Sequence, residues 1–302
     1  MEKTGSINRR ELLVATGVAL LGTTSLPVLA KTQEASPDVE PIPVAELPEP
    51  TDDGIDVPVL GIAFGSDEIV ATTEVAAGTV RMLTAVPYED FGSILFRIPD
   101  DQPDAIGQIL AAVSQPEPEV PEWLRTTHFP GGVRTDYRYG TTAEGFVTLL
   151  PGTYGVIDFA TGQGTTFLAT GESVEAVSIP ATVAVTALDS MTYNGLEGAV
   201  PAGRQLWQLT NAGEMAHNIH IFSTPEGTTA DDILESFSSE EQSSDDGTSG
   251  GLMSTQTLSL GAVNHFYLDL EPGRHAAMCT ESTDFSGPPH AFMGMIVTFD
   301  VA

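Results

Sequence analysis

Residues 270–302 read LEPGRHAAMCTESTDFSGPPHAFMGMIVTFDVA and combine strand-like runs with side chains that bind metals. This stretch contains Cys279, the one cysteine of the chain. His290 follows eleven positions later, and Met295 comes five positions after that. A further histidine, His217, lies upstream in the stretch NAGEMAHNIHIF. The rest of the sequence is best understood from these four residues.

A thiolate, two imidazoles and a thioether are the ligands of a mononuclear blue-copper site. The sulfur donors suit Cu(I), imidazole also suits Cu(II), and the shared geometry is a His₂Cys plane with a long axial Met. We therefore predict that His217, Cys279, His290 and Met295 bind one type 1 copper. Met293 is a competing sulfur, but on a strand it would point to the opposite face from Met295. Each ligand also has a plainer interpretation as a buried or surface side chain.

The residues around these positions resemble a known family. NAGEMAHN resembles the strand that brings the first histidine to the copper in plastocyanin-like cupredoxins, and PGRHAAMC with PPHAFMGMIVTFDV resembles their last hairpin. The spacing from His290 to Met295 is that of the plastocyanins. The gap from Cys279 to His290 is longer than in plastocyanins and azurins and nearer that of copper nitrite reductases. The resemblance covers roughly residues 172–302.

The resemblance also implies a supporting set of contacts. Asn218 follows the first histidine and Thr280 follows the cysteine. In the family these neighbours hydrogen-bond across two strands and stiffen the thiolate site. Electrons in the family pass through an exposed imidazole edge, here that of His290. The apolar residues beside it would form the docking patch for a redox protein partner.

Composition narrows the classes of partner. The formal net charge is −31 and the sequence pI is about 4.1. Such a surface repels nucleic acid and anionic lipid, which excludes those partners. It suits a basic redox partner or a saline environment in which self-repulsion is screened. A single cysteine also excludes a disulfide within the chain.

The beginning of the chain predicts export. Residues 8–13, NRRELL, resemble a twin-arginine motif, and an apolar run then leads to a small-residue cleavage site near Ala30. We expect residues 1–30 to be a signal peptide, leaving a periplasmic, cell-surface or extracellular protein without stable membrane insertion. The alternative is an uncleaved membrane anchor. Residues 31–55 are rich in Pro and acidic residues and predict an extended tether that buries no apolar surface.

An internal repeat predicts two domains of one fold, residues 56–172 and 173–302. AAGTVRMLT matches PAGRQLWQLT, ILFRIPDDQPDAIGQIL matches IHIFSTPEGTTADDILESF, and LLPGTYGVID matches LEPGRHAAMC. The second of these matches carries a predicted helix in each half, at 103–113 and within TTADDILESF. In the first half the four ligand positions are occupied by residues that do not build a blue-copper site, namely Phe91, Asp158, Phe167 and Glu172. We expect the first domain to be a degenerate copy without copper.

These inferences predict an all-β protein of two tandem cupredoxin-like Greek-key β-sandwiches, each with a short helical excursion. The expected function is that of an exported blue-copper protein that carries single electrons and is not an enzyme. Two alternatives remain open. One is a copper-free binding or sensor module on the same scaffold. The other is a two-domain copper oxidase or nitrite-reductase-like enzyme, which would need a second copper site although the chain has only six histidines.

Overall fold

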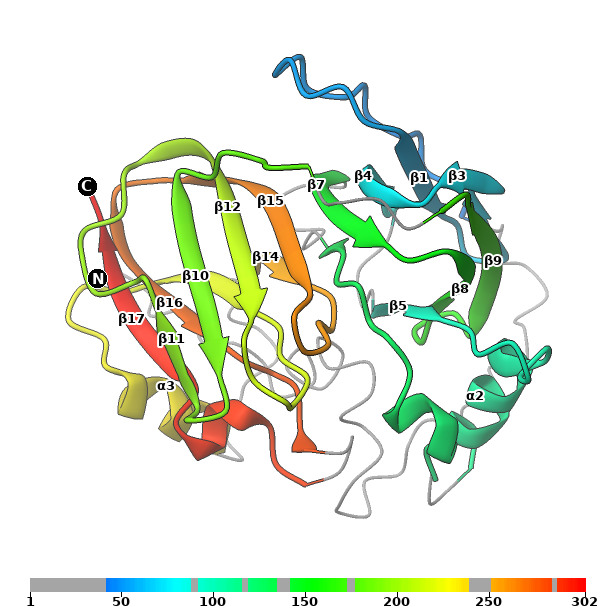
Figure 1. Ribbon diagram of the computed structural model, residues 1–302. Helices are drawn as coiled ribbons and strands as arrows, with labels where there is room; N and C mark the ends of the chain where they lie inside the picture. Colours follow the sequence, from blue (N-terminus) through cyan, green and yellow to red (C-terminus); the bar gives the residue numbers. More distant parts are fainter. Residues whose placement is uncertain are drawn as a thin grey trace.

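Strands dominate the computed structural model, and its helices are few and short (Figure 1). The residues described are 42–87, 92–115, 119–134, 142–172, 177–238, 251–283 and 287–302. The predicted signal peptide, Phe91 and the polar loop at 239–250 lie outside them. Among the described residues, no helix has the length and apolar character needed to cross a bilayer.

The strands are short and follow one another through turns. Those of the first half are β1 (Val59–Phe64), β2 (Ile69–Ala71), β3 (Glu74–Ala76), β4 (Gly78–Ala85), β5 (Ser93–Arg97), β6 (Val133–Arg134), β7 (Thr142–Leu149), β8 (Gly152–Asp158) and β9 (Gln163–Thr170). Those of the second half are β10 (Val183–Leu188), β11 (Thr192–Asn194), β12 (Gly203–Asn211), β13 (His220–Thr224), β14 (Gly251–Thr255), β15 (Val263–Leu270), β16 (Gly273–Met278) and β17 (Ile296–Val301).

The two longer helices, α2 (Ala105–Val113) and α3 (Ala230–Ser238), occur where they were predicted. Two short 3-10 helices, η2 (Glu122–Arg125) and η4 (His290–Met293), were not predicted, and η4 shows that the placement of Met293 on a strand is wrong. α2 begins two residues after the start expected from its apolar periodicity. The Pro-Gly turns that open β8 and β16 place Gly152 and Gly273 at φ values of 139° and 141°, which favour glycine.

One eight-stranded sheet contains strands of both halves, in the order β11-β10-β12-β15-β7-β4-β1-β2 (Figure 1). The pairings on the two sides of its centre mirror each other. β1 pairs with β4 in parallel and β4 with β7 antiparallel, as β10 pairs with β12 and β12 with β15. β7 and β15 join the halves, with Phe146 opposite His265. Gly145 permits this close approach, because a Cβ there would lie 2.2 Å from the His265 carbonyl oxygen.

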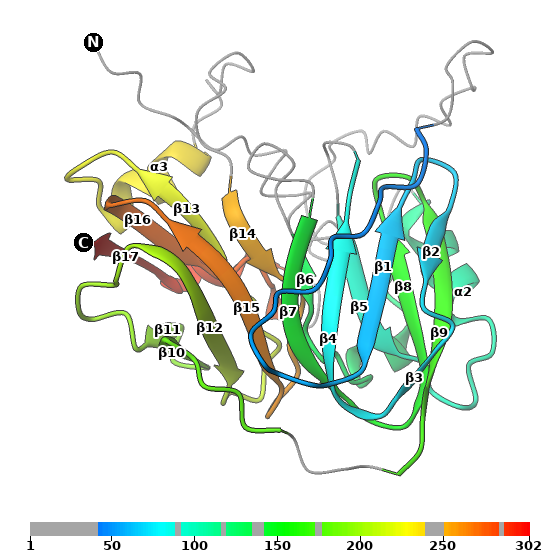
Figure 2. The same cartoon turned by 90° about the horizontal axis from the view of Figure 1, so that it is seen from above.

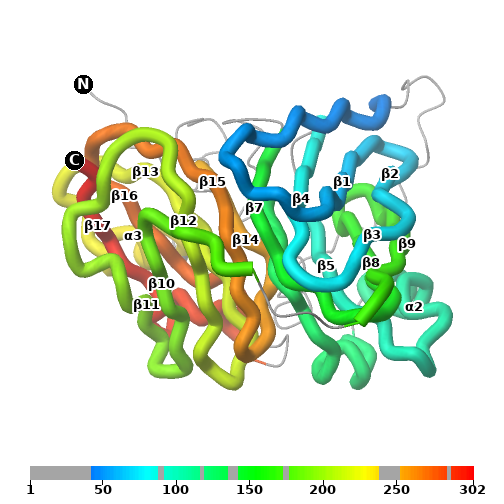
Figure 3. The backbone as a smooth tube through the Cα atoms, turned by 45° about the horizontal axis from the view of Figure 1, so that its top comes forward, coloured from blue at the N-terminus to red at the C-terminus, as the bar shows by residue number. Residues whose placement is uncertain are grey.

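Two smaller sheets complete the fold, and the halves lie side by side (Figure 3). One has the order β3-β9-β8-β5 and belongs to the first half. The other has the order β17-β16-β13-β14-β6 and also crosses between the halves, because β6 pairs with β14. The architecture is thus all-β. The expected pair of separate tandem Greek-key sandwiches is not confirmed, since two of the three sheets contain strands from both halves.

The end of the predicted tether is extended but bound to the eight-stranded sheet. We call residues 42–57 the strap, and Figure 2 shows it in blue across the first-half strands. Its start pairs with the end of β1 and the following turn, with Ala45 N–H donating to the Phe64 carbonyl at 2.9 Å. Ile55 and Val57 then pack against a small cluster that includes Phe146. The prediction that residues 31–55 bury no apolar surface is therefore wrong for Ile55.

The main hydrophobic core is continuous across the two halves. It contains Leu60 and Tyr154 from the first half and Trp207 from the second. It also contains two of the predicted metal ligands, Cys279 and Met295. The candidate site is therefore fixed by the packing of the whole molecule.

Candidate metal centre

Three separate segments bring the predicted ligands together. Cys279 comes directly after β16, and His290 begins η4. His217 lies just before β13 and forms an isolated bridge with Leu258, in which each backbone N–H donates to the other's carbonyl at 3.1 and 2.8 Å. The side chains of His217, Cys279 and His290 are all fully buried.

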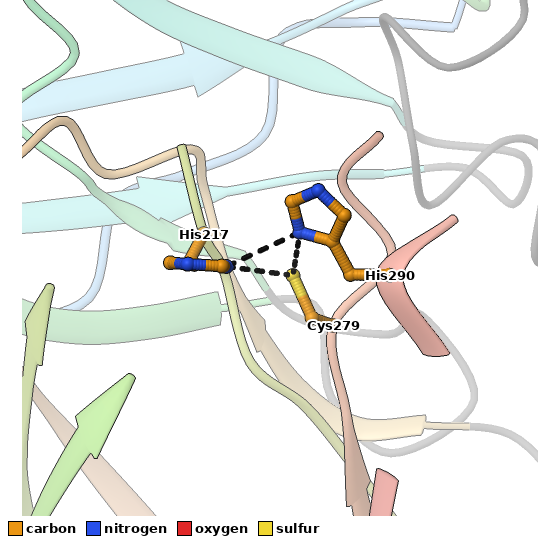
Figure 4. Close-up of side chains that lie close together, drawn as sticks. All are labelled: His217, Cys279 and His290. Atoms are coloured by element: carbon orange, nitrogen blue, oxygen red, sulfur yellow. Dashed lines mark hydrogen bonds between the residues drawn. The ribbon is translucent and has the colours of Figure 1, made fainter. Parts of the chain in front are cut away.

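The three donor atoms face one another (Figure 4). The sulfur of Cys279 lies 3.7 Å from Nδ1 of His217 and 3.6 Å from Nδ1 of His290. The two nitrogens lie 3.2 Å apart, and all three atoms are within 4.8 Å of one another. The sequence positions, 62 and 11 residues apart, thus converge on one point.

These separations fit a single metal ion. A metal with bonds of about 2.0 Å to nitrogen and about 2.3 Å to sulfur in a trigonal plane separates two nitrogens by about 3.5 Å and nitrogen from sulfur by about 3.7 Å. The distances in this site agree with that plane to within a few tenths of an ångström. The arrangement therefore suits a His₂Cys plane of the kind that takes a weak axial ligand.

The two candidate thioethers differ sharply in position. Met295 is fully buried in the same core cluster as Cys279, whereas Met293 is 49% exposed. The backbone of Met295 is tied to two ligands, because its N–H donates to the His290 carbonyl and its carbonyl accepts from the Cys279 N–H. Position and burial favour Met295 as the axial donor.

Asn218 connects the two strands that carry the ligands. Its backbone N–H points to the sulfur of Cys279 at 3.5 Å. Its side chain accepts from the Thr280 N–H at 2.9 Å and donates to the Thr280 hydroxyl at 2.9 Å. It also donates to a carboxylate oxygen of Glu281 at 3.0 Å. These contacts hold the cysteine in place and direct a hydrogen bond to its sulfur.

The protonation states follow from burial. Burial, and then the nearby charge of Glu281, raises the pKa of the Cys279 thiol to about 12. Burial, and then His217, lowers the pKa of His290 to about 4. The metal-free site thus holds a thiol and neutral imidazoles, and a metal would have to displace the thiol proton to bind.

The outer nitrogens of the two imidazoles have different partners. Nε2 of His217 lies 3.2 Å from a carboxylate oxygen of Asp189, and Nε2 of His290 lies 3.4 Å from the Thr283 hydroxyl. Sequence reasoning missed Asp189, which comes 28 positions before its histidine in a turn with no metal-site motif.

His290 does not present the exposed edge that the family resemblance implies. Its side chain is fully buried, partly because Thr283 lies against its outer nitrogen. A cavity of about 390 Å³ separates Thr283 from residues 125–129 of the first half. The exposed apolar side chains here are Phe292 and Met293, 40% and 49% exposed.

The first half also forms part of the wall around the site. Gly131 N–H donates to the Thr257 carbonyl at 3.1 Å, and Pro130 is bridged to Leu258, the residue that pairs with His217. The segment at 129–132 is therefore separated from His217 only by the segment that contains Thr257 and Leu258.

Comparisons with known proteins found similar solved structures but no similar sequence. No protein-family model and no curated protein sequence matches the chain. One similar solved structure is the dithionite-reduced auracyanin of Roseiflexus castenholzii, which is 19% identical in sequence and has a TM-score of 0.28. The match covers 41% of this chain and 99% of that one. Auracyanin A of Chloroflexus aurantiacus, described as a blue copper protein, has 14% identity, 40% and 97% coverage, and a TM-score of 0.27. An azurin of Methylomonas sp. strain J has 16% identity, 40% and 96% coverage, and a TM-score of 0.28. The chain is thus similar to small cupredoxins over about two fifths of its length.

Proposed function

We propose that this protein carries single electrons with one type 1 copper held by His217, Cys279, His290 and Met295. The observation that carries this proposal is the convergence of three buried donor atoms within 4.8 Å, at separations suited to one ion. Copper, when bound, would supply a centre that gains and loses one electron. A thiolate with two imidazoles and a weak thioether is the donor set that serves both of its oxidation states.

The surrounding residues are suited to keeping this site rigid. Backbone hydrogen bonds tie residues 279–281 to residues 290–295, and Asn218 ties the cysteine to the strand of His217. A donor set fixed in this way needs little movement when its charge changes. Burial of both imidazoles keeps water from the position that the ion would occupy.

The first half is proposed to be a degenerate copy of the second. Its strands succeed one another with the same pairings, parallel then antiparallel in the large sheet and antiparallel for β5 with β8 as for β13 with β16. Asp158 at the end of β8 corresponds to Cys279 after β16, and Phe167 is packed on Tyr154 at 5.3 Å between ring centroids. Domain limits of 56–172 and 173–302 remain part of this proposal.

The partner is proposed to be a basic redox protein that meets the surface beside His290. Phe292 and Met293 offer exposed apolar contacts there, and the charge of −31 would attract a basic protein. Export by the twin-arginine pathway is proposed from Arg9 and Arg10. Replacing both with Lys should retain the precursor in the cytoplasm, and unchanged export would contradict this part.

Copper titration tests the central proposal. The protein loaded with Cu(II) should show intense visible absorption from thiolate-to-copper charge transfer and contain one copper per chain. Cys279→Ser should abolish the absorption, whereas Ser282→Ala, three residues away, should keep it. Absorption that survives in Cys279→Ser would refute the ligand assignment. Two or more coppers per chain would favour the oxidase or nitrite-reductase-like enzyme, and no copper at all would favour the copper-free module.

A further inference from the structure

Asp189 lies in the turn between β10 and β11, outside the segments that supply the ligands. One of its carboxylate oxygens lies 3.2 Å from Nε2 of His217, and its side chain remains 36% exposed. No other carboxylate among the described residues is paired with a ligand histidine in an ion-pair contact. This contact therefore links the buried centre to a charged group at the surface.

The carboxylate is held in place before any metal binds. Its two oxygens accept the backbone N–H groups of Glu214 and Met215 at 2.7 and 3.2 Å. Gly213 makes this arrangement possible, because a Cβ at that position would lie 2.0 Å from a carboxylate oxygen of Asp189. Asn211 fixes the same loop by accepting from Gly213 N–H and donating to the Met215 carbonyl.

The contact determines which nitrogen of His217 carries the proton. An ionised carboxylate only accepts hydrogen bonds, so Nε2 must be the protonated nitrogen and Nδ1 is left with its lone pair. Both oxygens of Asp189 accept backbone N–H groups and the side chain is partly exposed to water, which is the environment of an ionised carboxylate.

The outer nitrogens of the two imidazoles therefore have partners of different charge. His290 has a neutral hydroxyl, that of Thr283, at its outer nitrogen, whereas His217 has a full negative charge. A carboxylate on the far side of a ligand imidazole raises the basicity of the ligand and fixes its orientation. A more basic ligand stabilises the more highly charged ion.

We propose that Asp189 is a positioning residue that holds His217 with Nδ1 toward the metal and lowers the reduction potential of the site. The effect on the reduction potential rests on the proposed function, because it requires bound copper. The positioning part concerns only residues of this chain and holds for the metal-free protein as well.

Two substitutions separate charge from position. Asp189→Asn keeps an oxygen that can accept from His217 and removes the charge, so copper should still bind and the reduction potential should rise. Asp189→Ala removes both, and copper affinity should fall by about 10–100-fold. Asp300→Asn is the matched control, because Asp300 is a surface acid paired with Arg274 at 2.9 Å and away from the ligands. The reduction potential of Asp300→Asn should differ from that of the wild type by less than the reduction potential of Asp189→Asn does.

Nitrogen NMR of histidine-labelled, metal-free protein provides a readout that needs no copper. His217 should be protonated on Nε2 in the wild type and in Asp189→Asn, and should lose this single tautomer in Asp189→Ala. A potential in Asp189→Asn equal to that of Asp300→Asn would overturn the tuning role. An unchanged tautomer in Asp189→Ala would overturn the positioning role. Failure of the wild type to bind copper would refute the proposed function and leave the tautomer result standing.

Discussion

Glu144 on β7 offers a direct test of how the strap is attached to the sheet. Its carboxylate is 9% exposed and forms an ion pair with Arg81. It also accepts the backbone N–H of Thr51 at 3.0 Å and the Thr51 hydroxyl, and Arg204 of the second half lies 3.5 Å away. Glu144→Ala would therefore release the strap and leave a buried guanidinium short of one partner.

The expected loss of unfolding free energy depends on the contacts that Arg81 keeps. Removing one member of a buried ion pair costs about 3–5 kcal/mol. Arg81 keeps its contact with Asp53, which places the expected loss at the lower end, about 3 kcal/mol. Glu144→Gln keeps hydrogen-bonding capacity and loses only charge, so we expect a loss of about 1–2 kcal/mol. Urea unfolding followed by tryptophan fluorescence, to which the buried Trp207 contributes, measures both losses.

Amide hydrogen exchange at Thr51 reports on the strap itself. The Thr51 N–H should be protected in the wild type and exchange faster in Glu144→Ala. Glu74→Ala is the matched control, because Glu74 is an exposed strand glutamate and its loss should change stability by no more than about 0.5 kcal/mol. A loss below about 1 kcal/mol in Glu144→Ala, together with unchanged Thr51 exchange, would refute this reasoning.

Three further changes test other parts of the molecule. Burial lowers the pKa of His265 from 6.5 to about 4, so between these pH values the unfolded chain binds a proton that the folded chain does not. The free energy of unfolding of the wild type should therefore fall by up to about 3 kcal/mol as the pH drops through that window. The loss should be smaller in His265→Gln, as measured by urea titrations at several pH values. Met295→Leu should keep the blue absorption and raise the reduction potential in voltammetry, whereas Met293→Leu should leave both unchanged. Gly131 has φ of 89° and a Cβ there would lie 2.7 Å from a side-chain oxygen, so Gly131→Ala should cost about 1–3 kcal/mol in urea unfolding; Gly198→Ala, in open space, should cost less.

The candidate ligand set could be proposed from the sequence because metal chemistry restricts residue type. A single cysteine followed by His290 and Met295 at a family spacing leaves few interpretations, and His217 completes the set. Geometry then places His217, Cys279 and His290 around one point. Strand and helix positions were also predictable, since Pro-Gly turns and apolar periodicity are local signals.

Contacts between distant segments could not be predicted in the same way. Asp189 has no local signal, and its role depends on a loop that folds back over 25 residues to present Glu214 N–H. The composition of the strap indicated a free tether, because its attachment depends on single polar contacts such as that of Thr51 with Glu144. The burial of His290 likewise depends on a contact from another segment, that of the Thr283 hydroxyl with its outer nitrogen.

The pairing of β7 with β15 has a consequence for each half taken alone. Separated from the other, either half would expose β7 or β15 as an unpaired edge strand, with Phe146 or Phe266 among the residues that lose their pairing. Free edges of this kind recruit further strands and lead to aggregation. Each half therefore covers the sheet edge of the other, and neither edge is exposed while the two remain paired.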